Sequence, residues 1–404
     1  IYGPWTGHER PSLLLRSRFG NLVGFDLFAS NFSNFNHVIS GGSGSGKSYL
    51  VNILLLQILK ENPKVFIVDI GGSYRKLCES LNGQYISLGV DSGISINPFD
   101  LQEGQTSPDS LKIKFLLGLV ESMTKEEGNS GLPRLERAEI EEAIAKVYES
   151  GKAPSFSVLR EILLLHPSAE IRRYGRILTP WCGNTAFGQF VDRPTTVALK
   201  KSVVSFDLKG MEGLPDLQAL CLLIITDFVW REVERDRSAK KFLIFDECWR
   251  LLENEAGSAF IAEVFRTFRK YNASAIAISQ NIDDFAKSRV STAILSNAAI
   301  KWILMQRGSD QTRLKEVLQL NDSEMALIAS LLQERGIYSE AFLMAGDDRA
   351  VVAIEATPLE YWIATSDARD LAEVEKELAS NNGKSRFEVL ESLSAKYPRG
   401  VAAG

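Results

Sequence analysis

Several features that mark particular classes of protein are scarce in this chain of 404 residues. The three histidines stand apart from one another, so a zinc site is not indicated. The four cysteines are scattered without CxxC spacing, and we expect them to be small buried hydrophobic residues in a reducing compartment. The longest apolar run, Ala219–Ile225, is far too short to cross a bilayer, and the sequence shows no signal peptide.

An excess of positive charge is also missing, since 46 lysines and arginines stand against 51 aspartates and glutamates, a formal net charge of -5. A surface dedicated to DNA is usually basic, so this balance argues against one, although a local basic channel in an oligomer stays compatible with it. The first residue is Ile1 rather than Met, so we expect either a fragment that lacks an upstream part or a chain whose start is disordered. Any association with a membrane is then expected to come through partners or through that missing part.

What the chain does contain is a phosphate-binding loop at Gly41–Ser48, GGSGSGKS, which matches the pattern GxxxxGK[ST]. The preceding Asn36–Ser40 is typical of a buried strand, and Tyr49–Leu59 of an apolar helix. Together they form an anion cradle, because unpaired backbone N–H groups and the helix dipole point at one spot. We predict that Lys47 reaches the β- and γ-phosphates of ATP and that the Ser48 hydroxyl ligates Mg²⁺. The predicted nucleotide-binding residues are Gly41, Gly42, Ser43, Gly44, Ser45, Gly46, Lys47, Ser48 and Tyr49.

A second motif, FLIFDE at Phe242–Glu247, predicts an apolar strand with two carboxylates at its C-terminal edge. In nucleoside triphosphatases the first acid, here Asp246, supports Mg²⁺ together with the loop hydroxyl of Ser48. The second acid, Glu247, can polarise the attacking water. The separation between Lys47 and Asp246 is unusually long, and a helical insertion between them accounts for it.

Polar side chains also follow two further predicted strands. Gln280, in AIAISQN, could sense the γ-phosphate or orient the attacking water, or it could be a loop amide at a strand end. We favour the sensor because the neighbouring strand carries Asp246. Asp69 lies near the C-terminal end of the apolar run Lys64–Ile70. Two roles stay open for it: it could hold a magnesium-bound water or anchor the following turn.

Three cations, Arg266, Arg269 and Lys270, come at the end of the helix that follows Asp246. Phosphoryl transfer builds negative charge on the transferred group, and an arginine fork stabilises that charge best. The alternative is that these cations complement the C-terminus of their helix.

The order of the predicted elements indicates an α/β fold. Strands at Ser202–Leu208, Lys241–Glu247 and Ala273–Ser279 alternate with helices, which implies a mostly parallel central sheet flanked by helices. Between Ser107 and Trp181 four stretches have helical spacing and no strand is convincing, so we predict an all-helical inserted subdomain. The predicted parts are 1–106 and 183–366 for the α/β core, 107–182 for the insertion, and 367–404 for C-terminal helices.

Several segments together resemble a known family. They are GGSGSGKS, VDIGGSYRKL, INPFDL, FLIFDECWRLL, FRKYNASAIAISQN and TPLEYWIATS. This set is similar to the type IV secretion ATPases of conjugation systems, the TraC/TrbE kind, within the FtsK–HerA superfamily. The resemblance runs from Gly3–Trp5 to about Ser366, and the most specific part is Asp246–Trp249 with the segment from Arg269 to Gln280. One departure is Cys248, where many relatives carry alanine.

The resemblance implies a RecA-like ATPase domain that uses ATP and Mg²⁺ and carries a helical insertion. It implies hexamers at the cytoplasmic face of the bacterial inner membrane, although the isolated domain could be monomeric or dimeric. Other secretion components of that membrane and a coupling ATPase would be its partners. Arg269 holds the place of the superfamily's arginine finger, which acts on the neighbouring subunit's nucleotide; Arg266 and Arg307 are the next candidates.

The sequence therefore predicts an ATP hydrolase that powers channel or pilus assembly and substrate transport in type IV secretion. The first alternative is a DNA translocase or coupling ATPase of the FtsK, HerA or TraD kind, which would need a basic pore. The second is a nucleotide-gated scaffold whose slow hydrolysis only switches its partners.

Overall fold

The computed structural model describes residues 11–89, 92–101, 104–124, 131–247, 252, 255–287, 290–306, 311–380 and 383–401. Gly3–Trp5, Cys248, Trp249 and Arg307 lie outside the described residues. The chain divides into two compact units, Ile1–Ile86 with Lys201–Asp207 and Asp236–Gly404, and Ser87–Lys200 with Leu208–Arg235. The four parts predicted from the sequence stay a prediction.

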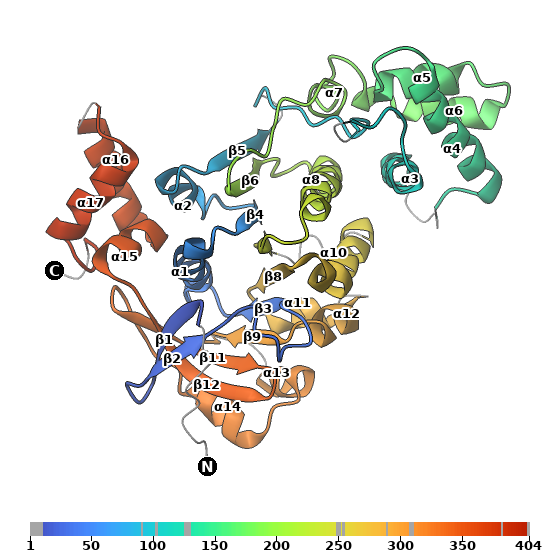
Figure 1. Ribbon diagram of the computed structural model, residues 1–404. Coiled ribbons are helices and arrows are strands. Elements are labelled where there is room, and N and C mark those ends of the chain that lie inside the picture. The colour runs from blue at the N-terminus through green and yellow to red at the C-terminus, as the bar shows by residue number, and fades with distance from the viewer. Residues whose placement is uncertain are drawn as a thin grey trace. The chain divides into compact units, whose positions relative to one another are not determined.

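A large mixed sheet organises the first unit (Figure 1). Its order is β2-β1-β12-β11-β9-β3-β8-β7-β4-β6-β5, and β10 pairs with β11. The strands are β1 (Leu13–Ser17), β2 (Leu22–Phe25), β3 (His37–Ser40), β4 (Lys64–Asp69), β5 (Gln84–Gly89), β6 (Val203–Gly210), β7 (Lys241–Phe245), β8 (Ala273–Ser279), β9 (Ile300–Ile303), β10 (Gln333–Glu334), β11 (Tyr338–Ala345) and β12 (Asp348–Glu355). The run β9-β3-β8-β7-β4-β6 is parallel, which confirms the predicted sheet, and antiparallel strands extend it beyond β9.

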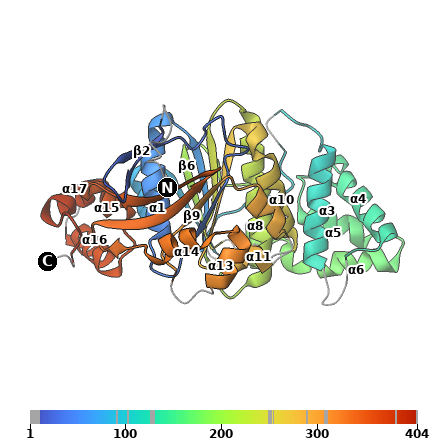
Figure 2. The ribbon, with the colours of Figure 1, turned by 90° about the horizontal axis from the view of Figure 1, so that it is seen from below.

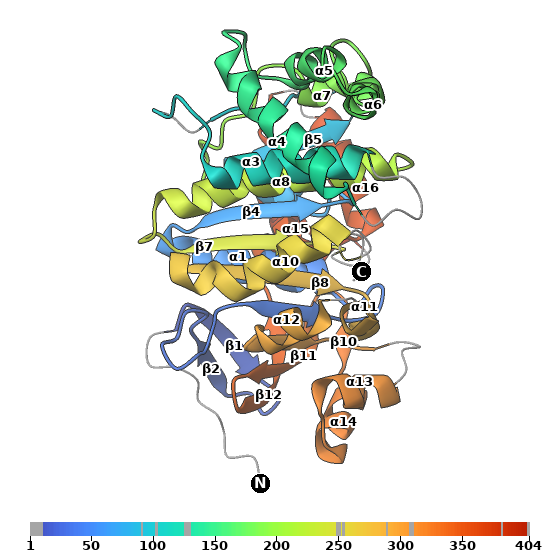
Figure 3. The same cartoon turned by 90° about the vertical axis from the view of Figure 1, so that its right-hand side faces the viewer.

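The central parallel strands are buried along their whole length, as strands covered on both faces must be. Helix α1 (Lys47–Ile58) lies behind the sheet and α10 (Glu255–Thr267) in front of it in Figure 3. The other helices of this unit are α2 (Arg75–Ser80), α11 (Ile282–Lys287), α12 (Ser291–Ser296), α13 (Gln311–Leu318), α14 (Asp322–Ala329), α15 (Pro358–Ala364), α16 (Ala368–Ser380) and α17 (Arg386–Lys396), with short 3₁₀ turns η1 (Leu59–Glu61) and η3 (Phe268–Tyr271). In parallel sheets covered by helices on both faces, ligand sites form in the loops at the carboxyl ends of the strands.

The second unit contains α3 (Ser110–Thr124), α4 (Arg134–Glu149), α5 (Phe156–Leu164), α6 (Ala169–Ile177), η2 (Thr179–Trp181), α7 (Gly188–Val191) and α8 (Pro215–Arg235). Helices α3 to α6 form one cluster (Figure 2). Its core is made by apolar residues at helical spacing, among them Leu116, Val120, Ile140, Ile144 and Leu159. As predicted, the described residues between 107 and 182 contain helices and no strand.

Two helices of the first unit were not predicted although their start signals are present in the sequence. Asn321 with Glu324 forms a capping box before α14, and Thr357 with Glu360 forms another before α15. Pro358 adds a residue that favours the first helical turn. No helix in the part of the chain that the structure describes is long and apolar enough to be a membrane span.

A buried carboxylate ties the C-terminal helices to α15. Asp370 is fully buried and accepts hydrogen bonds from the Tyr361 hydroxyl at 2.7 Å, the Thr365 hydroxyl at 3.0 Å and the Val401 amide at 2.9 Å. Burial lowers the pKa of nearby Lys76 to about 8, while Asp370 acts in the opposite direction. This network fixes the end of α15, where the chain turns into α16.

We expect Asp370→Ala to lower the free energy of unfolding by about 2–4 kcal/mol, because it leaves several buried donors unpaired. Thermal or urea unfolding measures this effect. The matched control is Asp322→Ala, since Asp322 is almost fully exposed and forms a surface ion pair with Lys315. Equal stability of the two variants would contradict the structural role of Asp370.

Candidate functional site

The loop Gly41–Ser48 connects the end of β3 to the start of α1, as predicted. Gly44 and Gly46 have φ angles of 73° and 92°, the left-handed region that favours glycine. A Cβ atom on Gly41 would come within 2.8 Å of the Leu304 Cβ, so this position also requires glycine. The glycines therefore let the backbone curl tightly enough to surround a phosphate group.

Lys47 is folded back onto its own loop. Its Nζ donates to the carbonyl oxygens of Gly41 at 2.8 Å and Gly42 at 3.2 Å, and the residue is only 9% exposed. Burial lowers the pKa of Lys47, while the negative charges of Glu247 and Asp246 act in the opposite direction. The ammonium group thus has two carbonyl contacts that it can exchange for phosphate oxygens.

Ser48 and Asp246 meet where α1 begins and β7 has ended. The Ser48 hydroxyl donates to the Asp246 carboxylate at 3.4 Å, and Asp246 is 6% exposed. Burial raises the pKa of Asp246 to about 7, and the charges of Asp69 and Glu247 add to the effect. A buried carboxylate beside a hydroxyl is a set of oxygen donors that fits Mg²⁺.

Tyr74, which the sequence did not single out, lies beside this pair. Its hydroxyl is buried and has no hydrogen bond of good geometry within the described residues. Burial and the nearby charges of Asp246 and Asp69 raise the pKa of Tyr74.

Glu247 and Gln280 are joined across the ends of neighbouring strands. The Gln280 Nε2 donates to the Glu247 Oε1 at 2.9 Å, because β7 and β8 are parallel and end at the same edge of the sheet. Glu247 has a φ angle of 53°, in the left-handed region that side chains other than glycine rarely adopt. Strained backbone of this kind clusters at functional sites, and here it places the carboxylate beside the phosphate loop.

Asp69 takes one of the two roles left open by the sequence. Its carboxylate accepts hydrogen bonds from the backbone amides of Gly71 at 2.9 Å and Ser73 at 2.6 Å, so it anchors the turn after β4. It also lines the same cavity as the loop. That cavity, of about 190 Å³, is lined by Ser43, Gly44, Gly46, Lys47, Ser48, Tyr49, Asp69, Gly71, Ser73, Asp246, Glu247, Gln280 and Ser366.

Arg269 is the one predicted catalytic residue that the structure places outside this cavity. It lies in η3, where its Nη1 donates to the Ser33 carbonyl at 2.6 Å. Arg266, near the end of α10, and Lys270, in η3, are exposed as well. Within one chain the arrangement therefore brings together Lys47, Ser48, Asp246, Glu247 and Gln280, and leaves Arg269 on the surface.

The antiparallel half of the sheet supports the loop in a way that no sequence signal indicated. The Ser339 hydroxyl of β11 donates to the Ser45 carbonyl at 3.1 Å across a sequence separation of 294 residues. A Cβ atom on Gly46 would lie 3.2 Å from the same hydroxyl. The hairpin thus packs directly against the phosphate loop.

Comparison with known proteins gives relatives along most of the chain. The TraG P-loop domain family matches residues 23–395. The chain is 25% identical over 322 residues to the protein TraC of Escherichia coli strain K12, which covers 74% of this chain and 36% of that protein. It is 23% identical over 344 residues to the type IV secretion system protein virB4 of Bartonella quintana, covering 84% of this chain and 42% of that protein. The chain therefore spans less than half the length of these curated relatives.

A solved structure shares the fold. VirB4 of Thermoanaerobacter pseudethanolicus superposes with a TM-score of 0.74 at 26% sequence identity, covering 87% of this chain and 99% of that chain.

Proposed function

This chain belongs to the TraG P-loop domain family, and from this premise we propose that it hydrolyses ATP to power type IV secretion. The observation that carries the proposal is one cavity that gathers Lys47, the pair Ser48–Asp246 and the pair Glu247–Gln280. Each of these groups suits one task in phosphoryl transfer. The relatives named TraC and virB4 support the secretion context.

In the proposed mechanism Lys47 leaves the carbonyls of Gly41 and Gly42 and contacts the β- and γ-phosphates. Ser48 and Asp246 would hold Mg²⁺. The chemistry that Mg²⁺ supplies when bound is neutralisation of charge on the β- and γ-oxygens. The backbone amides of the loop orient the phosphates for attack.

Glu247 acts as the general base and takes a proton from the attacking water. Gln280 holds the carboxylate through its Nε2 and reports contact with the γ-phosphate, since both side chains line the cavity. Because the Gln280 amide and the Glu247 carboxylate are hydrogen-bonded, we expect a displacement of either side chain to move the other as well.

The assembly that we propose is a hexamer at the cytoplasmic face of the bacterial inner membrane, bound to other secretion components and a coupling ATPase. The α/β core would comprise 1–106 and 183–366, with an all-helical insertion at 107–182 and C-terminal helices at 367–404. These assignments are supported by the similarity of the chain to TraC and virB4.

The proposed function is tested by steady-state ATPase assays of the purified chain, with and without DNA. The mass of the chain in solution is measured in parallel, so that activity can be related to the oligomeric state. We expect Mg²⁺-dependent hydrolysis that DNA leaves unchanged. Stimulation by DNA would favour a translocase or coupling ATPase instead. Binding of ATP without turnover in the assembled form would favour a nucleotide-gated scaffold.

Arg269 lies outside its own cavity, so we propose that it completes the site of a neighbouring subunit. We expect Arg269→Ala to lower turnover strongly with little loss of ATP affinity, the signature of an interaction made mainly in the transition state. Measuring kcat and the dissociation constant of ATP separates the two effects. Lys270→Ala, on the same exposed segment, is the matched control and should leave both unchanged.

Mixing two inactive variants tests the action between subunits. When Arg269→Ala subunits are assembled with Lys47→Ala subunits, an intact loop can meet an intact arginine, and partial activity should return. No recovery in mixtures shown to co-assemble would mean that Arg269 acts in its own subunit or only caps its helix.

A further inference from the structure

Tyr74 is a buried polar residue to which the proposed mechanism gives no role. It immediately precedes α2 and is fully buried in the hydrophobic core of the first unit. Its carbonyl oxygen accepts a hydrogen bond from the Cys78 amide at 3.0 Å, so its backbone is fixed at the start of the helix. The phenol ring packs as an apolar side chain would, and this packing does not explain why the ring carries a hydroxyl group.

The hydroxyl group of Tyr74 lies next to the two side chains that we propose as magnesium ligands. It is within reach of the Asp246 carboxylate and the Ser48 hydroxyl, although within the described residues it forms no hydrogen bond of standard geometry. Ser48 and Asp246 line the cavity, whereas Tyr74 is fully buried. Tyr74 can therefore act on a ligand in the cavity only through these two side chains.

The Asp246 carboxylate has room for a further hydrogen-bond donor. Its Oδ1 accepts from the Glu247 amide at 3.0 Å, and its Oδ2 accepts from the Ser48 hydroxyl at 3.4 Å, which is long for a bond between two oxygens. An ionised carboxylate offers about four acceptor positions. Side chains that bind metals are commonly held in orientation by donors outside the metal's own ligands. The Tyr74 hydroxyl is placed to be such a donor.

The segment that carries Tyr74 is anchored on its N-terminal side by Asp69. The Asp69 carboxylate accepts hydrogen bonds from the amides of Gly71 at 2.9 Å and Ser73 at 2.6 Å. Ser73 is the residue directly before Tyr74, so the turn after β4 determines where the ring enters the core.

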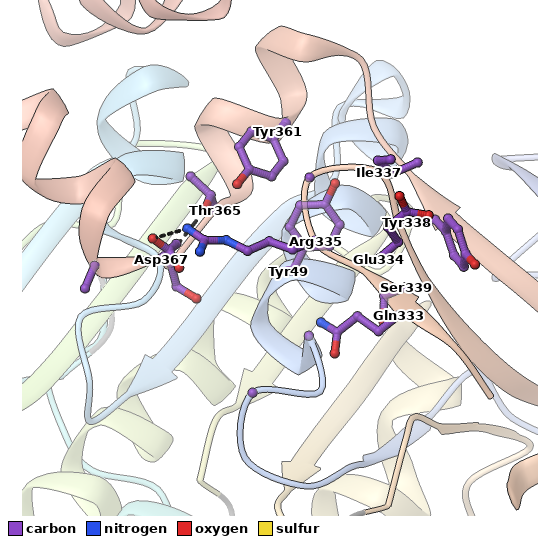
Figure 4. Close-up of a pocket in the computed structure, with 15 residues that line it drawn as sticks. Tyr49, Gln333, Glu334, Arg335, Ile337, Tyr338, Ser339, Tyr361, Thr365 and Asp367 are labelled. Carbon is purple, nitrogen blue, oxygen red and sulfur yellow. Dashed lines mark hydrogen bonds and ion pairs between the residues drawn. The ribbon is translucent and has the colours of Figure 1, made fainter. Parts of the chain in front are cut away.

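On its C-terminal side the same segment is anchored by Lys76, which is 5% exposed. Its ammonium group donates to the carbonyl oxygens of Trp362, at 3.2 Å, and Thr365, near the end of α15. Figure 4 shows Thr365 on the segment that joins α15 to α16, where Asp367 forms an ion pair with Arg335 from the turn between β10 and β11. Anchors on both sides give the hydroxyl a fixed position behind the cavity.

We propose that Tyr74 is a positioning residue for the magnesium site, with its hydroxyl donating to Asp246 and holding the carboxylate beside Ser48 in the orientation that Mg²⁺ requires. The proposal rests on the proposed function, because that function is the reason to expect Mg²⁺ at this place. It assigns a role in metal binding to the segment between Asp69 and Lys76, which connects the site to the end of α15.

The test is Tyr74→Phe, which removes the hydroxyl and keeps the ring in the core. The Mg²⁺ concentration that half-saturates the Mg²⁺-dependent part of ATP binding should rise about tenfold or more, the loss typical for an outer partner of a metal ligand. Binding of the nucleotide in EDTA should stay unchanged. The melting temperature without nucleotide should also stay unchanged, because the hydroxyl has no standard hydrogen bond to lose. Fluorescence titration with mant-ATP, over a series of Mg²⁺ concentrations and in EDTA, measures the binding.

Tyr148→Phe is the matched control, since the Tyr148 hydroxyl donates to the Phe99 carbonyl at 2.8 Å in the second unit. This variant should leave the Mg²⁺ dependence unchanged. An unchanged half-saturating Mg²⁺ concentration in Tyr74→Phe, with or without a lower melting temperature, would overturn the positioning role and leave the proposed hydrolase intact. An equal loss of mant-ATP binding with Mg²⁺ and in EDTA would do the same. A wild-type protein that binds mant-ATP equally well with and without Mg²⁺ would contradict both proposals.

Discussion

Lys47→Ala should lower ATP turnover by ~100-fold or more, the size expected when a cation that stabilises a phosphoryl-transfer transition state is lost. The structure adds that the fold should survive. Among the described residues, the Lys47 ammonium donates hydrogen bonds only to the carbonyls of its own loop at Gly41 and Gly42, so its removal breaks no hydrogen bond to a distant described residue. Initial rates at saturating ATP, together with the melting temperature, measure both parts of the prediction.

Lys60→Ala is the matched control for Lys47→Ala. Lys60 follows α1 in η1 and is exposed, with one long contact of 3.5 Å to the carbonyl of Pro11. Turnover of this control should equal that of the wild type. If Lys47→Ala itself stays within a few-fold of wild-type activity, the loop is not the catalytic phosphate site.

Glu247→Gln should bind ATP and fail to turn it over. A positioned general base contributes roughly 10²–10⁴ in rate, and an amide cannot take the proton. Glutamine nearly preserves the shape of the side chain and keeps an oxygen that can accept from Gln280, so binding should persist. Equilibrium binding of ATP and single-turnover hydrolysis distinguish a trapped complex from a lost site.

Two further variants define the specificity of that result. Asp246→Asn should instead weaken the Mg²⁺-dependent part of ATP binding, because it removes the carboxylate next to Ser48. Glu263→Gln, at an exposed position of α10, should change neither binding nor turnover. Normal hydrolysis by Glu247→Gln would assign the base elsewhere, for example to a water held near Asp69.

Much of the site could be predicted because its parts are encoded in short local patterns. The glycines of Gly41–Ser48 allow backbone angles that no other residue takes easily, and the helix after them follows from the same stretch. The motif FLIFDE ends a buried strand in two acids, and Gln280 ends the next strand along the chain. Once the strands are parallel neighbours, the pleat and register bring these ends together without further information.

Short helices were missed for a different reason. The apolar periodicity of α14 and α15 extends over too few residues to be distinct, and only their capping boxes mark them. Local patterns do not specify the antiparallel extension beyond β9, because pairing between distant strands depends on contacts across the whole sheet.

The sequence by itself determined the fold class, the phosphate loop and the identity of the paired carboxylates, since each depends on neighbouring residues and on strand alternation. Only the tertiary structure decided that Asp69 anchors a turn, that Arg269 lies outside its own cavity, and that Arg335 reaches Asp367 beside the loop. The physical reason is distance along the chain. Contacts such as Ser339 with Ser45 join residues separated by 294 positions, and only packing of the whole unit brings them together.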